Sequence, residues 1–148
     1  MSTLAQPREP EPVRVVQNVR AAFEVTSDEK RDGIATGLST MDTQLELYGK
    51  MGVAKDDLDL HAVFRGQAGY FLLTDDTYNK FTNDQSGNPN KETVRRLVKA
   101  GISIEFCSQT MKHHQWTAAD ILPEVTIVES ALTRLIDLQL QNYAYVKL

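Results

Sequence analysis

Short β-rich apolar runs alternate with segments of helical periodicity along most of this 148-residue chain. The runs that predict strands are residues 19–25, 58–65, 102–106, 125–128 and 143–147. Between the first two runs, large residues recur three and four positions apart, as on one face of a helix: Ile34, Leu38, Met41, Leu45 and Tyr48. Strands that are separated by helices need crossover connections, so this order predicts a parallel sheet with helices on both faces.

Further helical segments are predicted along the chain, which divides into an arm and one domain. These segments are residues 68–73, 77–81, 90–100, 109–114, 118–122 and 132–140. Residues 1–18 contain Pro7, Pro10 and Pro12 and are expected to form an extended N-terminal arm. Residues 19–148 are expected to form a single α/β domain, because a chain of this length holds one core.

Charge and hydropathy exclude several classes of function. The chain has 16 Lys and Arg residues against 20 Asp and Glu residues, a net charge of −4, so no nucleic-acid partner is expected. No apolar run approaches the roughly 20 residues of a membrane-spanning helix, so no membrane partner is expected. The N-terminus lacks the apolar region of a signal peptide, which favours a cytoplasmic location. A periplasmic location is expected only if a leader has been removed.

The sequence carries no recognisable motif for a cofactor or a metal ion. It lacks a GxxxxGK[ST] phosphate loop, a GxGxxG dinucleotide turn and a GxSxG nucleophile elbow. His113 and His114 are adjacent, so on a helix their side chains diverge by about 100° and cannot share a metal ion. His61 lies within a predicted strand, where a packed or edge-exposed imidazole is the usual situation. No cofactor and no metal ion are therefore expected.

Cys107 is the only cysteine of the chain, and it follows the third predicted strand. Ligands of an open parallel sheet gather beyond the carboxyl ends of its strands, so the loops at 26–33, 65–69 and 107–110 are expected to converge. The amides of a helix that starts just after Cys107 would stabilise a thiolate and lower the thiol pKa. A lone cysteine next to a strand is also often a small core residue, so a reactive and an inert thiol both remain open.

Two nearby charges are expected to act on this thiol in opposite directions. Arg65, in the loop after the second strand, would add a positive influence if the two loops are neighbours. Glu105 is two residues before Cys107 and points to the same face of the strand, so its carboxylate would oppose a thiolate nearby.

The segments KAGISIEFCSQTM, DILPEV and SALTRLIDLQLQNYAYVKL carry a resemblance to a known family. The matching residues are Gly101, Ile104, Cys107, Gln109, Thr110, Leu122, Pro123, Val125, Leu135, Gln139, Tyr143 and Ala144. Residues 19–148 resemble the DsrE/DsrF-like family of small sulfur-relay proteins. Two positions depart from the family pattern: Arg65 stands where the family has His before the glycine, and Asn142 stands where it has Gly.

The resemblance implies a three-layer α/β/α fold with a five-stranded, mostly parallel sheet, assembled as a homotrimer or homohexamer. It also implies that Cys107 accepts sulfur as a persulfide and exchanges it with donor and acceptor proteins. The residues expected to support the sulfur from the adjoining loops are Ser108, Gln109, Thr110, Arg65 and Gly66. With one cysteine, the chain has no resolving thiol of its own and no independent catalytic apparatus.

The alternative function is a small-ligand-binding or assembly module without catalysis, in which Cys107 is structural. Residues 70–73 are four consecutive large apolar side chains, more than one face of a helix can bury. Under this alternative they are expected to contact a second subunit, and a helix deep in the core is the other interpretation.

Overall fold

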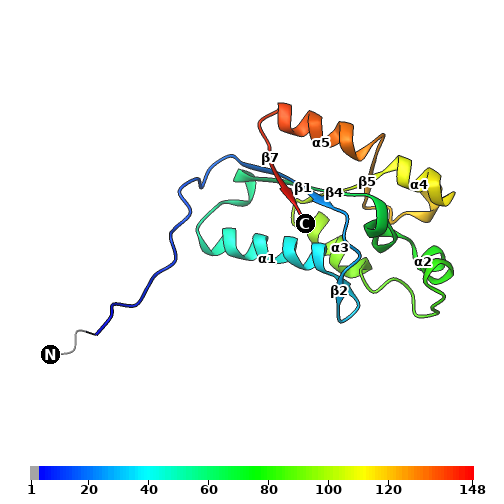
Figure 1. Ribbon diagram of the computed structural model, residues 1–148, viewed down its shortest axis with the longest axis horizontal. Coiled ribbons are helices and arrows are strands. Elements are labelled where there is room, and N and C mark those ends of the chain that lie inside the picture. Colours follow the sequence, from blue (N-terminus) through cyan, green and yellow to red (C-terminus); the bar gives the residue numbers. More distant parts are fainter. Residues whose placement is uncertain (1–3) are drawn as a thin grey trace.

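Five parallel strands form the central sheet, in the order β6-β5-β4-β1-β7 (Figure 1). They are β1 (Val19–Val25), β4 (Leu58–Phe64), β5 (Ser103–Cys107), β6 (Thr126–Val128) and β7 (Ala144–Lys147). The structure is a computed structural model, which describes residues 4–148. Each predicted strand is present to within one residue at each end, so the prediction of a parallel α/β sheet is confirmed.

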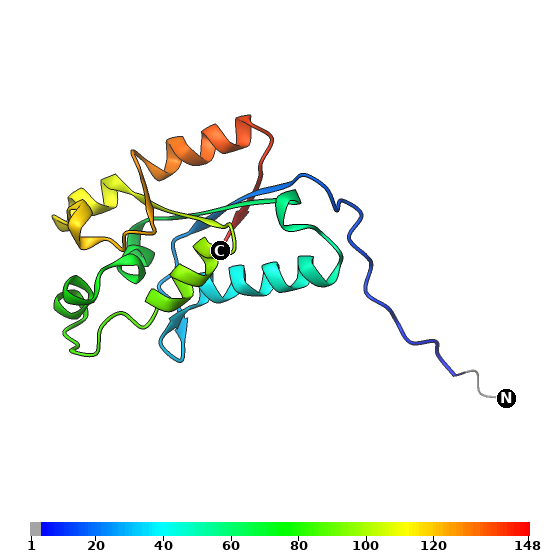
Figure 2. The same cartoon turned by 180° about the vertical axis from the view of Figure 1, so that it is seen from behind.

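Helices cover both faces of this sheet and complete the three layers of the predicted α/β/α fold (Figures 1 and 2). On one face lie α1 (Thr36–Lys50) and α3 (Lys91–Lys99), and on the other lies α5 (Ala131–Leu140). The helix α4 (Ser108–His114) follows β5 directly, beyond its carboxyl end. The remaining helical elements are α2 (Asp75–Thr82) and three 3-10 helices, η1 (Lys55–Asp57), η2 (Gly66–Leu72) and η3 (Ala118–Asp120).

The side chains of the strands alternate between two cores of unequal size. On β4, Leu60, Ala62 and Phe64 belong to the main core, whereas Val63 belongs to a smaller core beneath α5. The buried members of this smaller core are Ala22, Val63, Cys107, Ala131, Leu135 and Leu138. The helix α5 therefore rests on few apolar contacts, and Cys107 is one of them.

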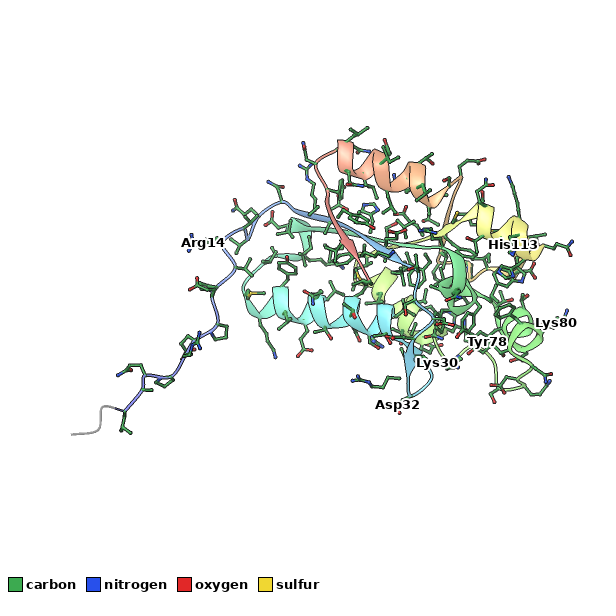
Figure 3. The ribbon with its side chains drawn as sticks, viewed as in Figure 1. Arg14, Lys30, Asp32, Tyr78, Lys80 and His113 are labelled. Carbon is green, nitrogen blue, oxygen red and sulfur yellow. The ribbon has the colours of Figure 1, made fainter. Side chains whose placement is uncertain are left out.

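The segment before α1 is a hairpin, whereas the sequence predicts a turn followed at once by helix. The strands β2 (Lys30–Arg31) and β3 (Ile34–Ala35) pair antiparallel, so α1 begins only at Thr36. Asp32 lies at the tip of this hairpin (Figure 3). Asp32 and Gly33 have φ of 54° and 83°, and two-residue type I′ turns need a positive φ at both positions. The prediction that the helix begins at Ile34 is therefore wrong, because Ile34 pairs with Arg31 in the hairpin.

The apolar run at residues 70–73 is packed within the chain itself. Phe71, Leu72 and Leu73 are fully buried in the main core. The ring of Tyr70 is half-buried and lies against the rings of Phe71, Tyr78 and Phe81. Its own chain already covers Phe71, Leu72 and Leu73, so a second subunit is not needed to bury this apolar run.

Residues 4–18 form no helix or strand, and both ribbon views show them leading away from the sheet (Figures 1 and 2). Their side chains are exposed, and the amide of Asn18 donates to Oδ1 of Asp57 at 3.2 Å where the chain joins the fold. Residues 1–3 of the predicted arm lie outside the described residues. Among the described residues, no helix combines the length and the apolar character that crossing a membrane requires.

Candidate functional site

The sulfur of Cys107 is surrounded by backbone donors at the carboxyl edge of the sheet. Cys107 is the last residue of β5 and is 5% exposed. The first amide of α5, that of Ala131, donates to Sγ of Cys107 at 3.3 Å. The sulfur therefore lies at the N-terminus of a ten-residue helix, where the aligned peptide dipoles favour a negative charge.

The turn into α4 supplies further donors to the same sulfur. The backbone amides of Gln109 and Thr110 and the hydroxyl of Thr110 also act on this sulfur and lower the pKa of its thiol. The Thr110 oxygen also accepts the amide of Gly66 at 3.1 Å, so its own hydrogen is free to point at Sγ. Gly66 has a φ of 60°, which residues with a side chain rarely adopt, and this conformation accompanies the hydrogen bond to Thr110.

Burial and hydrogen bonding act on the thiol in opposite directions. Burial alone would raise the pKa of Cys107, because desolvation disfavours the charged thiolate. The hydrogen bonds from Ala131, Thr110 and Gln109 outweigh burial, so the pKa of Cys107 is lowered below its ordinary value. Cys107 is thus a mostly buried sulfur whose surroundings favour the anionic form.

A pocket of about 350 Å³ opens beside this sulfur. Its lining residues are Arg65, Gly66, Cys107, Gln109, Thr110, His113, Ser130, Ala131 and Leu132. None of these lining residues is acidic, and His113 extends from α4 (Figure 3). A pocket with this lining, next to a sulfur rich in hydrogen-bond donors, suits a small anionic group or the tip of another chain.

The site residues predicted from the sequence lie together, but they do not all act on the sulfur. The hydroxyl of Ser108 donates to the carbonyl of Glu129 at 2.8 Å, which ties the start of α4 to the segment that enters α5. Arg65 lines the pocket, yet its Nε donates to the buried carboxylate of Glu24 at 2.6 Å. The charge of Arg65 is therefore already partnered, and this residue is a wall of the pocket and not a direct partner of the thiol.

The contribution of α5 to the site is not predicted from the sequence. Ala131 lies 24 residues beyond Cys107, and its side chain has no chemistry that would single it out. One signal was present, because β6 pairs with β5 and the loop after β6 therefore ends at the same sheet edge. Residues 26–33, expected at the site, do not line this pocket, because β4 separates β1 from β5.

The three histidines have different surroundings. Nδ1 of His61 contacts Glu105 and its Nε2 contacts Asp59 at 3.0 Å, so this imidazole is packed and partnered. His114 stacks on Trp116, with ring centroids 4.2 Å apart, whereas His113 lines the Cys107 pocket. Within residues 4–148, no group of three or more His, Cys, Asp or Glu side chains is arranged to hold a metal ion.

The fold and the site define a class of protein: a small three-layer α/β protein with a single cysteine at a strand end. The sequence model of the DsrE/DsrF-like family matches residues 22–148, and the chain belongs to that family. Its structure is similar to that of MTH1491, a protein of unknown function from Methanobacterium thermoautotrophicum, with a TM-score of 0.68. The two share 17% sequence identity over 88% of this chain and 99% of that one, which shows a common fold. No curated protein matches the sequence.

Proposed function

We propose that this protein is a sulfur carrier in which Cys107 accepts a sulfur atom as a persulfide and passes it on. The proposal rests on the hydrogen bond that Sγ accepts from the amide of Ala131, and on the amides of Gln109 and Thr110 that lower the thiol pKa, beside a pocket without an acidic lining residue. Such donors favour the thiolate, which is the nucleophilic form of cysteine. Membership in the DsrE/DsrF-like family supports the same assignment.

Both steps of the proposed cycle are nucleophilic exchanges at sulfur. In loading, the Cys107 thiolate attacks the outer sulfur of a persulfide or polysulfide donor, and the donor leaves as a thiolate or a shorter polysulfide as its S–S bond breaks. In unloading, an acceptor thiolate attacks the outer sulfur of the Cys107 persulfide, and Cys107 leaves as a thiolate. Neither step consumes an oxidant or a reductant. Because Cys107 is the only cysteine, donor and acceptor are other molecules, either a partner protein's cysteine or a small thiol.

The neighbouring residues have separate parts in this proposal. Gln109, Thr110 and Ala131 hold the sulfur anion, both before loading and when Cys107 leaves as a thiolate. Ser108 holds the two helix starts together, while Arg65 and Gly66 form part of the pocket wall through which a donor reaches the sulfur. The protein acts as a carrier and not as an enzyme with further catalytic groups. Its cytoplasmic location stays a prediction, and a reducing compartment keeps such a single thiol free.

Treatment with inorganic polysulfide at neutral pH is expected to add the mass of one sulfur atom to the protein. Intact-mass spectrometry measures this gain, and addition of glutathione is expected to restore the original mass because its thiolate accepts the outer sulfur. Glutathione that is treated with polysulfide alone serves as the positive control for the donor. A protein whose mass does not change while glutathione takes up sulfur would contradict the proposal.

We also propose that the chain assembles with copies of itself into a trimer or hexamer. The outer face of α5 carries Leu132, Ile136 and Leu140 at four-residue spacing, with exposed fractions of 58%, 56% and 80%. Exposed apolar side chains that are grouped in this way often mark a surface that contacts another protein. Because Leu132 also lines the Cys107 pocket, a subunit that covers this stripe would adjoin the thiol.

Light scattering of the purified protein is expected to give the mass of three or six chains. Ile136→Asp places a charge in the middle of the stripe and is expected to yield single chains, whereas Asp137→Asn on the neighbouring face is expected to leave the assembly intact. A wild-type protein that scatters light as a single chain would contradict the assembly.

A further inference from the structure

A cluster of charged side chains lies beneath α5, close to the cysteine but outside its pocket. Glu105 on β5 is fully buried, and its Oε1 accepts Nε of Arg134 from α5 at 2.6 Å. A second guanidinium nitrogen of Arg134 donates to Oε2 at 3.5 Å, so the arginine meets both oxygens of the carboxylate. His61 and the Ser103 hydroxyl contact Glu105 from within the sheet.

This cluster keeps the carboxylate of Glu105 ionised. Burial alone would raise the pKa of Glu105, but hydrogen bonds from His61, Arg134 and Ser103 hold it below its ordinary value. Around these groups, Asp137 lies 3.5 Å from Arg134, and Asp59 lies 3.0 Å from His61 and also accepts the hydroxyl of Tyr143. Both members of the Glu105–Arg134 pair therefore carry their charges at neutral pH.

The ion pair and the sulfur contact join the same two elements side by side. Glu105 and Cys107 are two residues apart on β5, so both side chains point to the face that α5 covers. Ala131 and Arg134 are three residues apart on α5, so they lie on one face of that helix. Two neighbouring contacts therefore join α5 to β5: Arg134 with Glu105, and the Ala131 amide with Sγ of Cys107.

The apolar contacts of α5 do not by themselves determine the position of this helix along β5. Only Ala131, Leu135 and Leu138 of α5 are buried, and hydrophobic attraction has no preferred direction. A two-point arginine–carboxylate contact is directional and fixes one geometry. A buried ion pair often adds little stability, and where it is kept, a role in specifying structure is its best-attested use.

We infer that the Glu105–Arg134 ion pair is a positioning device for the thiol: it fixes α5 along β5 so that the amide of Ala131 stays within hydrogen-bond distance of Sγ. Neither residue touches the reacting sulfur, so both act through the backbone of α5. The inference rests on the proposed function in that it matters for sulfur transfer only if the thiolate of Cys107 is the reactive form.

The double variant Glu105→Gln/Arg134→Met tests this without a change in net charge. The ion pair is lost while the side-chain volumes stay similar. The helix α5 can then shift along β5, and the hydrogen bond from the Ala131 amide to Sγ becomes weaker. The apparent pKa of Cys107, read from the rate of iodoacetamide alkylation against pH, is expected to rise by about one unit, with up to about tenfold less thiolate on the acid side of the profile. Hydrogen exchange at the Ala131 amide, followed by NMR, is expected to become faster.

The matched control is Asp42→Asn/Arg96→Met, which removes an ion pair between α1 and α3 on the opposite face of the sheet. This variant is expected to keep the wild-type pH profile. Arg134→Lys keeps both charges but loses the planar fork, so a smaller rise, of about half a unit, is expected; it serves as the test if the double variant does not fold.

A pH profile of the double variant, or of Arg134→Lys, that coincides with the wild-type profile would overturn the inference. Equal loss of reactivity at every pH would also overturn it, because a merely structural role lowers the rate without moving the profile. The outcome is separable from that of the proposed function. A wild-type protein with a lowered thiol pKa that takes up no sulfur would contradict the carrier and leave the positioning role intact.

Discussion

Replacing Cys107 with serine is expected to abolish all uptake of sulfur by the protein. Cys107 is the only thiol of the chain, so no other side chain can form a persulfide in its place. A serine hydroxyl is close to a thiol in size and accepts the hydrogen bond from the Ala131 amide, so the fold is expected to persist. The variant therefore separates loss of chemistry from loss of structure.

Two measurements on Cys107→Ser check this result together. Intact-mass spectrometry after polysulfide treatment is expected to show no added sulfur, and the thermal melting temperature is expected to stay close to that of the wild type. A Cys107→Ser protein that still gains sulfur would show that the sulfur is bound elsewhere, and the proposed role of Cys107 would be refuted.

The second large effect is expected from Phe106→Ala, which empties the core next to the site. Phe106 is fully buried, and the backbone of Gly69 lies so close to its ring that a Cβ on Gly69 would come within 2.5 Å of it. Deleting a ring packed this closely is expected to lower the free energy of unfolding by about 3–5 kcal/mol. For a chain of this size, the melting temperature then falls by roughly 10 °C.

Phe81→Ala provides the matched control, because it removes the same ring from an exposed position. Phe81 is 47% exposed and packs on Tyr70 and Trp116 at the surface, so a loss of about 1 kcal/mol or less is expected. Chemical denaturation of the two variants measures both values. A Phe106→Ala protein that is no less stable than Phe81→Ala would show that the main core does not depend on close packing at β5.

The strands and the long helices follow from periodicity in the sequence, because burial on a sheet or beside it dictates which positions are apolar. The hairpin before α1 does not follow from periodicity. Ile34 and Ala35 fit the helical spacing of the residues after them, and only the pair Asp32-Gly33 marks a type I′ turn. The hairpin forms there instead of a longer helix, because Ile34 pairs with Arg31 and cannot also begin a helix.

Part of the candidate site could be predicted from topology alone. The strand-end position of Cys107 and the nearby turns at Gly66 and Thr110 follow from the order of the strands. The donor from Ala131 depends on how far α5 reaches along β5, which no local pattern encodes. The same holds for Arg65, whose charge is engaged by Glu24 on a neighbouring strand and not by the thiol.

The function proposed for Cys107 requires that backbone and hydroxyl donors hold its sulfur as an anion. Its most direct test is the rate of alkylation of the wild-type protein by iodoacetamide as a function of pH, since Cys107 is the only thiol that can react. The structure predicts a lowered pKa, so the midpoint of the profile is expected below the value of about 8.5 for a free cysteine. A midpoint at or above that value would contradict the account, because burial would then outweigh the donors around the sulfur.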